Sequence, residues 1–378
     1  MTTLLTDSAR SVPFFDGAPM MEGLKEDILN EVSDLLDSGR FINGPDVAEF
    51  EATFAAYCET AACVCAASGL DALRLALMAA GLEQGDEVIV PAQTFIATFE
   101  AVTQAGGVPV VADVSESDYN LDPAAAEAAV TKRTRFLMPV HLYGQMADMR
   151  ALGLLAMRCE LGVLEDACQA HGADRDGLRA GAESVAGAFS FYPAKNLGAA
   201  GDAGALVTDD IELADRVRAL REHGQTEKYK HVTAGFTARM DTLQAIVLKH
   251  KLPHLDSWND SRRAASRFYS DALEGVGDLR LPRVPEGSNP VWHLYVIRTA
   301  DPEGLQSFLG ERGVATGRHY PEPPHLSAAY ADLGHEPGSF PVAEAISREG
   351  LSLPMYPGIS EEQLASVVDA ITAYFARG

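Results

Sequence analysis

The stretch that decides the fold is Gly187–Thr208, with the sequence GAFSFYPAKNLGAAGDAGALVT. Two apolar runs, Ala186–Phe191 and Gly204–Val207, lie at the two ends of this stretch and are typical of buried strands. The loop between them is rich in Gly and Ala and holds one lysine, Lys195, with no carboxylate before Asp202. A lysine in apolar surroundings has a lowered pKa, and its amine becomes a nucleophile. The alternative is a surface loop with an incidental lysine, and the rest of the chain must discriminate between the two.

Upstream of this stretch, short apolar strands alternate with helices. The expected elements are a turn into a strand at Gly85–Pro91, strands at Val108–Ala112, Phe136–Val140 and Gly162–Leu164, and helices at Pro123–Val130 and Met146–Arg158. Continuously apolar strands that alternate with helices predict an α/β fold, with a mostly parallel sheet and helices on both faces. Ligands bind such sheets at the carboxyl ends of the strands, where Asp113, His141 and Asp166 are expected.

The length of 378 residues exceeds what a single hydrophobic core usually supports. We therefore expect a large α/β domain over residues 1–257 and a smaller α+β domain over residues 258–378. The second region should contain a strand at Trp292–Thr299, a helix at Pro302–Arg312 and a terminal helix at Glu361–Phe375.

The charge balance and the cysteines exclude several classes of protein. The chain has 30 Lys and Arg against 54 Asp and Glu, a net charge of −24, which repels nucleic acid and anionic lipid. It has no apolar run of the ~20 residues that a membrane span needs, and its first residues do not resemble a signal peptide, so we expect a cytoplasmic protein. The five cysteines are too sparse for a disulfide framework, and Cys63 and Cys65 lack the partners of a zinc site, so we expect no metal.

An activated lysine beside an anion site suits pyridoxal 5′-phosphate (PLP), which forms an imine with a lysine amine. The pyridine nitrogen of PLP needs a carboxylate, and Asp166 at a strand end can supply one. The phosphate needs N–H and hydroxyl donors, which the helix start near Gly69 and the hydroxyl of Ser190 offer. Phe95 is suited to stack on the ring. Each of these residues alone has an ordinary structural reading, and their order along one sheet favours the cofactor.

Motifs across nearly the whole chain resemble the PLP-dependent nucleotide-sugar aminotransferases of the DegT/DnrJ/EryC1/StrS family. The similar runs are Phe41–Gly44, Ser68–Leu73, Gly85–Pro91 with Thr94 and Phe95, Glu165–Gly172, Phe189–Gly198, Arg239–Ala245, His319–Pro321 and Leu353–Pro357. The resemblance implies a fold-type-I PLP-dependent transferase that acts as a homodimer with shared active sites.

The resemblance also assigns roles by position. Lys195 would be the imine lysine and Asp166 the partner of the pyridine nitrogen. The other implied cofactor contacts are Gly69, Leu70 and Ser190 at the phosphate, Gln169 near the phenolic oxygen, Phe95 on the ring and Thr237 from the partner subunit. Candidates for contact with the substrate are Lys228, Tyr229, His231, Arg239, His319 and Tyr320, with Arg318 as a further basic group.

Three positions depart from the family pattern. Leu70 stands where Thr is usual, which removes a hydroxyl from the phosphate site but leaves the backbone donor. Thr237 stands where a longer Asn is usual. The loop at 201–204 reads Gly-Asp-Ala-Gly, where many members have Gly-Glu-Gly-Gly.

The implied reaction is transfer of an amino group, with L-glutamate as the expected donor, to a nucleotide-linked keto-deoxysugar. Such reactions serve deoxysugar, antibiotic or polysaccharide biosynthesis. The lysine loop and the run His319–Pro321 look most like members that act on a dTDP-3-keto sugar, and a 4-keto sugar stays open. The alternatives are a cyclitol-ketone aminotransferase of aminoglycoside-type biosynthesis and a PLP-binding homologue without catalysis. A dehydratase of the same family would carry His in place of Lys195.

Overall fold

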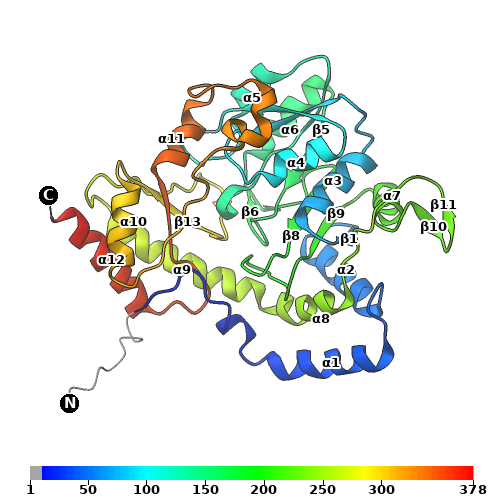
Figure 1. Ribbon diagram of the computed structural model, residues 1–378, viewed down its shortest axis with the longest axis horizontal. Helices are drawn as coiled ribbons and strands as arrows, with labels where there is room; N and C mark the ends of the chain where they lie inside the picture. Colours follow the sequence, from blue (N-terminus) through cyan, green and yellow to red (C-terminus); the bar gives the residue numbers. More distant parts are fainter. Residues whose placement is uncertain (1–10, 378) are drawn as a thin grey trace.

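The computed structural model describes residues 11–377 and is built around a seven-stranded sheet (Figure 1). In spatial order, the strands are β1 (Ala62–Ala66), β9 (Gly204–Thr208), β8 (Ala186–Ser190), β5 (Gly162–Asp166), β4 (Thr134–Leu137), β2 (Glu87–Pro91) and β3 (Val108–Ala112). Only β9 is antiparallel to its neighbours in this sheet, and the other adjacent pairs are parallel. The prediction of a mostly parallel sheet is therefore confirmed.

Helices cover both faces of this sheet because successive strand residues point to opposite sides. Val64 and Val88 belong to one hydrophobic core, whereas Cys63 and Ile89 belong to another. The first core includes residues of α3 (Gly69–Ala79), α4 (Ala97–Gln104), α7 (Ile211–Arg221) and α11 (Pro341–Glu349), and the second includes residues of α2 (Pro45–Tyr57), α5 (Pro123–Ala129), α6 (Met149–Cys159) and α8 (Thr242–Lys251).

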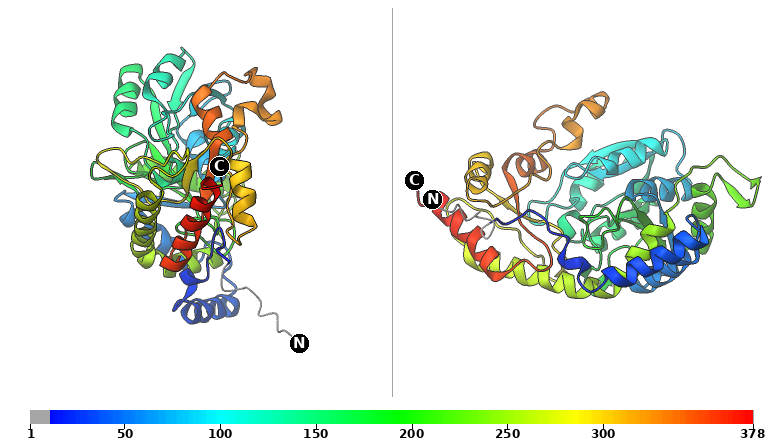
Figure 2. Two further views of the ribbon diagram at one scale, coloured as in Figure 1. Left: turned by 90° about the vertical axis from the view of Figure 1, so that its left-hand side faces the viewer. Right: turned by 60° about the horizontal axis from the view of Figure 1, so that its bottom comes forward.

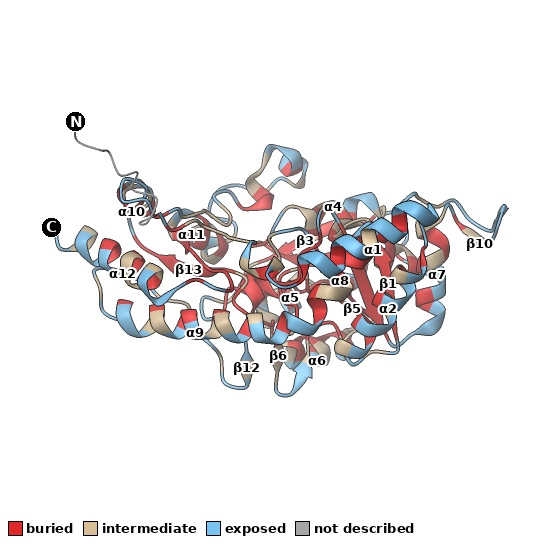
Figure 3. Ribbon diagram, turned by 90° about the horizontal axis from the view of Figure 1, so that it is seen from below, coloured by how far each residue is buried: buried red, intermediate tan, exposed pale blue. Residues whose placement is uncertain are grey.

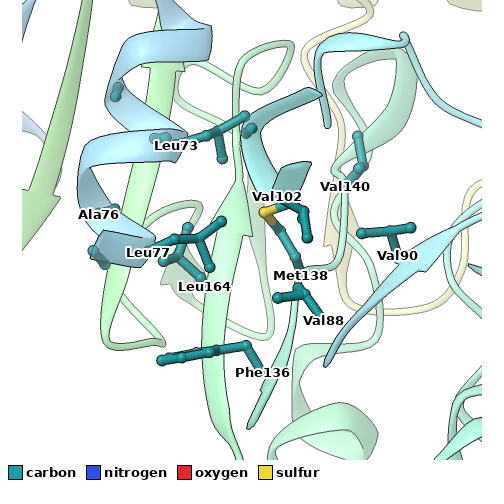
Figure 4. Close-up of a cluster of buried hydrophobic side chains, with 14 of the residues drawn as sticks. Leu73, Ala76, Leu77, Val88, Val90, Val102, Phe136, Met138, Val140 and Leu164 are labelled. Carbon is teal, nitrogen blue, oxygen red and sulfur yellow. The ribbon is translucent and has the colours of Figure 1, made fainter. Parts of the chain in front are cut away.

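The first core is tightly filled by side chains from helices and strands. Figure 4 shows Leu77 of α3 beside Leu164 of β5, with Val102 of α4 beside Met138. The residues of the sheet strands are mostly buried, whereas much of α1 (Lys25–Ser38) is exposed to solvent (Figure 3). Helix α1 begins at Lys25, after the 3₁₀ turn η1 (Pro19–Met21).

Several strand boundaries differ from the predicted ones: β4 lies two to three residues earlier than expected, β5 ends two residues later, and β13 is shorter at both ends. The sequence suggested a strand at Phe136–Val140, but β4 ends at Leu137. Pro139 has no N–H to donate to a neighbouring strand, so regular pairing stops before it. The chain then makes only an isolated bridge between Val140 and Asp166, which holds the Asp166 backbone at the carboxyl end of β5.

The C-terminal region is organised around α9 (Leu255–Leu273). This helix follows α8 through the short turn η3 (Leu252–His254) and runs toward the C-terminal helices (Figure 2). A third core joins α9 to the antiparallel pair β13 (Tyr295–Arg298) and β14 (Gly350–Leu353) and to α10 (Pro302–Gly310) and α12 (Glu361–Phe375). Val12 enters the same core and bridges to Val314. The boundary at residues 257/258 falls within α9 and stays a prediction.

Smaller elements complete the chain. They are the hairpin β10 (Gln225–Glu227) and β11 (Lys230–His231), the three-stranded sheet of β6 (Asp174–Arg175), β7 (Leu178–Arg179) and β12 (Ser288–Asn289), and the 3₁₀ turns η2 (Leu142–Gly144), η4 (Pro324–Leu326) and η5 (Ala328–Leu333). The hairpin projects from the body of the molecule (Figure 1). Within residues 11–377, no helix has both the length and the apolar character needed to cross a membrane.

Candidate active site

A cavity of about 480 Å³ opens where β5 and β8 end and α3 begins. Its position agrees with the rule that ligands bind open α/β sheets at the carboxyl ends of parallel strands. Most of the predicted site residues meet in its wall, namely Gly69, Leu70, Phe95, Asp166, Gln169, Ser190, Lys195, His319 and Tyr320.

Lys195 is held in the cavity wall by the loop that follows β8. Its backbone N–H donates a hydrogen bond to the Tyr192 carbonyl oxygen at 2.8 Å. Burial lowers the pKa of the Lys195 amine, and the nearby Cys168 and Asp166 offset only part of that shift. The amine is therefore neutral, and nucleophilic, more often than that of a surface lysine. This placement favours the activated-lysine interpretation over the incidental surface lysine.

Asp166 ends β5 with its carboxylate fixed by two donors. Thr98 Oγ1 donates to Asp166 Oδ2 at 2.8 Å, and the Cys168 backbone N–H donates to Oδ1 at 3.2 Å. Asp166 is only 5% exposed, so its orientation depends on these contacts rather than on water. The sequence did not reveal Thr98, and the available signal was a second threonine four residues earlier, Thr94, whose hydroxyl contacts that of Thr98.

The start of α3 forms a small concave cradle beside Ser190. Ser68 caps the helix by accepting a hydrogen bond from the Asp71 N–H at 3.1 Å. The first N–H groups of a helix have no partner within it, so those of Gly69 and Leu70 are available to an anion. A Cβ at Gly69 would lie 2.7 Å from Ser190 Cβ and 2.8 Å from Cys168 Sγ, so only glycine leaves the cradle open.

Gln169 is locked in a single amide orientation. Its Oε1 accepts a hydrogen bond from the Tyr143 N–H at 2.7 Å, and its Nε2 donates to the Tyr320 hydroxyl at 3.1 Å. The Tyr320 ring lies 5.4 Å from that of Phe95. Gln169 and Tyr320 thus form one rigid side of the cavity, and Phe95 lies beside it.

Two further wall residues, Phe14 and His293, were missed from the sequence. Phe14 stacks on His319 with ring centroids 5.4 Å apart, and His319 Nδ1 pairs with Ser352 Oγ at 2.8 Å. Burial lowers the pKa of His319 to about 4, so its ring is neutral at physiological pH. No local sequence pattern predicts the position of Phe14, because it depends on the bridge between Val12 and Val314, which brings the N-terminal segment to the cavity.

Several predicted residues do not line this cavity within one chain. Lys228, Tyr229 and His231 lie exposed on and around the β10–β11 hairpin, and Tyr229 is 81% exposed. Arg239 is paired with Glu222 at 2.5 Å, and Thr237 Oγ1 contacts His223 Nε2 at 3.0 Å. A role for these residues at a shared site stays a prediction.

The strand-end residues Asp113 and His141, and the basic candidate Arg318, form structural contacts instead of lining the cavity. Asp113 accepts hydrogen bonds from the Val342 and Ala343 N–H groups and so holds the start of α11. His141 Nε2 lies 2.8 Å from Glu165 Oε2, with both side chains fully buried. Arg318 donates to the carbonyl oxygens of Ser347 and Arg348. Asp166 is the one member of the strand-end trio that lines the cavity.

The fold and site define an α/β protein in which a lysine, a buried carboxylate and the start of a helix line one cavity. The profile of the DegT/DnrJ/EryC1/StrS aminotransferase family matches residues 22–372, and the chain belongs to this family. Its fold is therefore fold type I of the PLP-dependent transferases, and the chain is an aminotransferase, as its motifs predicted.

One curated relative and two solved structures illustrate the similarity. The dTDP-3-amino-3,4,6-trideoxy-alpha-D-glucose transaminase of Streptomyces venezuelae is 48% identical over 97% of this chain and 97% of its own. The crystal structure of S. venezuelae DesV in complex with a ketimine intermediate has a TM-score of 0.95 at 48% identity, and covers 97% of this chain and 99% of that one. The structure of NtdA from Bacillus subtilis with bound cofactor PMP has a TM-score of 0.89 at 32% identity. The match covers 97% of this chain and 86% of that one.

Proposed function

We propose that this protein transfers an amino group from L-glutamate to the keto group of a nucleotide-linked deoxysugar, with PLP as cofactor. A dTDP-3-keto sugar is the favoured acceptor, because the S. venezuelae transaminase named above is 48% identical along nearly the whole chain. The observation that carries the proposal is the convergence of Lys195, Asp166 and the start of α3 on one cavity.

The cavity residues fit PLP in size and in chemistry. The cradle at Gly69 exists only because that residue lacks a Cβ, and its N–H groups with those of Leu70 and the Ser190 hydroxyl suit a phosphate. Asp166 would hold the pyridine nitrogen, Gln169 would lie near the phenolic oxygen, and Phe95 would contact the ring. PLP, when bound, supplies an electron sink for the carbon from which a proton is removed.

The protein's own residues would then perform three tasks. Lys195 Nζ, whose pKa is lowered by burial, would carry a proton from the α-carbon of glutamate to the cofactor in the first half-reaction, and from the cofactor to the sugar carbon in the second. Asp166, oriented by Thr98 and by the Cys168 N–H, keeps the ring nitrogen protonated. The apolar side chains of Leu70 and Phe95 would reduce the access of water to the reacting carbon.

We further propose that the active form is a homodimer whose sites are shared. Thr237, Lys228, Tyr229 and His231 are exposed and do not line the cavity of their own chain, and the last three lie on or beside the projecting β10–β11 hairpin (Figure 1). A second copy of the chain is the arrangement that would bring them to a phosphate or a sugar nucleotide. Leu70 and Thr237 would then hold the phosphate with fewer side-chain donors than the family pattern offers.

The replacement Lys195→Ala tests the central assignment. The variant should lose the visible absorbance of lysine-bound cofactor and all transamination, whereas Lys132→Ala, on the exposed surface, should keep both. Turnover by the Lys195→Ala variant would contradict the assignment.

The acceptor is tested by supplying glutamate with 3-keto and 4-keto nucleotide sugars and a cyclitol ketone while 2-oxoglutarate is followed. We expect 2-oxoglutarate to accumulate with the dTDP-3-keto sugar. Turnover of the cyclitol ketone alone would favour the aminoglycoside-type alternative. A colourless protein that does not react with glutamate would favour the non-catalytic homologue.

A further inference from the structure

The residue next to Lys195 is a fully buried amide whose contacts determine where the lysine loop lies. Asn196 Nδ2 donates one hydrogen bond to Asn259 Oδ1 at 2.9 Å and another to the Val291 carbonyl oxygen at 2.8 Å. Both asparagines are 0% exposed. The loop that carries Lys195 is thus attached to α9 and to the segment before β13, 63 residues and more along the chain.

Asn259 also connects to the segment that carries Asp166. Its Nδ2 donates to the His171 carbonyl oxygen at 2.9 Å, and His171 lies two residues beyond Gln169. The two bonds fix which end of the Asn259 amide faces which neighbour, because Oδ1 can only accept and Nδ2 can only donate. One side chain from α9 therefore sets the spacing between the Lys195 loop and the Asp166–His171 segment.

Burying the Asn196 side chain costs free energy that an apolar side chain in the same place would not cost. Asn196 Oδ1 is buried and has no hydrogen-bond partner among residues 11–377. A buried polar atom without a partner is unfavourable by roughly 1 to 3 kcal/mol, and an apolar pair of similar volume would avoid that. The gain is a single well-defined loop position, and a displacement of about 1 Å can slow a reaction by about a hundredfold.

We propose that Asn259, acting through Asn196, is a positioning residue for Lys195. It sets the distance and angle at which the lysine amine meets the carbonyl carbon of the cofactor, and it takes no part in holding the phosphate. The inference rests on the proposed function, because it assigns Lys195 as the residue that reacts with PLP.

The test separates positioning from binding by using two probes on cofactor-free protein. PLP reacts with Lys195, and borohydride trapping followed by mass spectrometry of the lysine peptide measures the rate of attachment. Pyridoxine 5′-phosphate carries an alcohol in place of the aldehyde, so it occupies the cradle without reacting and reports binding alone.

We expect Asn259→Ala to slow the attachment of PLP by about tenfold or more while its affinity for pyridoxine 5′-phosphate stays within about twofold. Asn289→Ala is the matched control, because Asn289 also donates through Nδ2, to Asp174 at 2.8 Å, but on the surface. The control should change neither quantity. Asn259→Ser, which leaves a smaller cavity, serves if the alanine variant does not fold.

Three results would be decisive against these assignments. An attachment rate unchanged in the Asn259 variant overturns the inference, and so does an equal loss of attachment and of pyridoxine 5′-phosphate affinity, which would mean general damage to the site. A lack of trapping at Lys195 in the unsubstituted protein overturns the proposed function itself.

Discussion

Thr98 Oγ1 donates a hydrogen bond to Asp166 Oδ2 at 2.8 Å, inside the protein. The same hydroxyl lies 2.7 Å from the Oγ1 of Thr94, which is four residues earlier and precedes α4. Thr98 belongs to α4 and Asp166 ends β5, so a side chain of one element orients the carboxylate of another that lies far along the chain. A hydrogen bond to a carboxylate that cannot be replaced by water is among the stronger ones in proteins.

Replacing Thr98 should therefore impair the carboxylate without removing it. We expect Thr98→Val to lower kcat by about tenfold or more, because a hydrogen bond to a charged group contributes roughly 1.5 to 3 kcal/mol. Thr98→Ser keeps the donor and should recover most of the loss. Steady-state kinetics checks this, and a Thr98→Val enzyme with unchanged kcat would show that the contact does not matter for turnover.

Adding a methyl group at Gly69 should close the phosphate cradle. The new Cβ would be 2.7 Å from Ser190 Cβ and 2.8 Å from Cys168 Sγ, closer than such atoms can approach. We expect Gly69→Ala to weaken PLP binding by at least about tenfold, since shifting the helix start moves its N–H donors.

Gly153 in α6 provides the control for this change. A Cβ there meets no atom within 4 Å, so Gly153→Ala should bind PLP normally and be slightly more stable. Fluorescence titration of both variants with PLP measures the difference. Equal affinities for the two alanine variants would argue against the cradle.

Removing the Phe14 ring should affect one half-reaction more than the other. Phe14 stacks on His319, a predicted sugar contact, and lines the cavity. We expect Phe14→Ala to raise KM for the nucleotide sugar by roughly tenfold, a loss in keeping with an aromatic contact, while the half-reaction with glutamate is unchanged. Stopped-flow measurement of each half-reaction checks the split. Equal slowing of both would place Phe14 outside the sugar side of the cavity.

Lys251 should make stability depend on pH in the alkaline range. It is 5% exposed, its Nζ donates to the Gly198 carbonyl oxygen, and burial lowers its pKa to about 8. An unfolded lysine has a pKa of about 10.4, so between these values the unfolded chain binds more protons than the folded one. The contribution of Lys251 to folding thus becomes more favourable as pH rises through this window.

Comparison with Lys251→Met isolates that contribution. The free energy of unfolding of the unsubstituted protein, relative to the variant, should rise by up to about 3 kcal/mol between pH ~8 and pH ~10.5. Urea unfolding of cofactor-free protein across this range provides the measurement. Parallel pH profiles would show that the ammonium group is not desolvated.

Local sequence patterns were enough for most of the elements. The terminal helix Glu361–Phe375 has the predicted bounds, and α3 begins at Gly69, where a helix start was predicted. These features depend on neighbours in the chain, where periodicity and capping chemistry are decisive. The error at β4 came from Pro139, which interrupted pairing inside an apolar run.

The sequence by itself determined the α/β architecture, the lysine loop and the family, because strand periodicity and motif spacing are local properties. Only the tertiary structure decided that Phe14 and His293 line the cavity, that Thr98 orients Asp166, and that Asp113 and His141 serve structural contacts. Those outcomes depend on residues far apart in the chain that meet at one edge of the sheet. Burial there lowers the pKa of the Lys195 amine and determines which amides are hydrogen-bonded, and no local sequence pattern predicts either outcome.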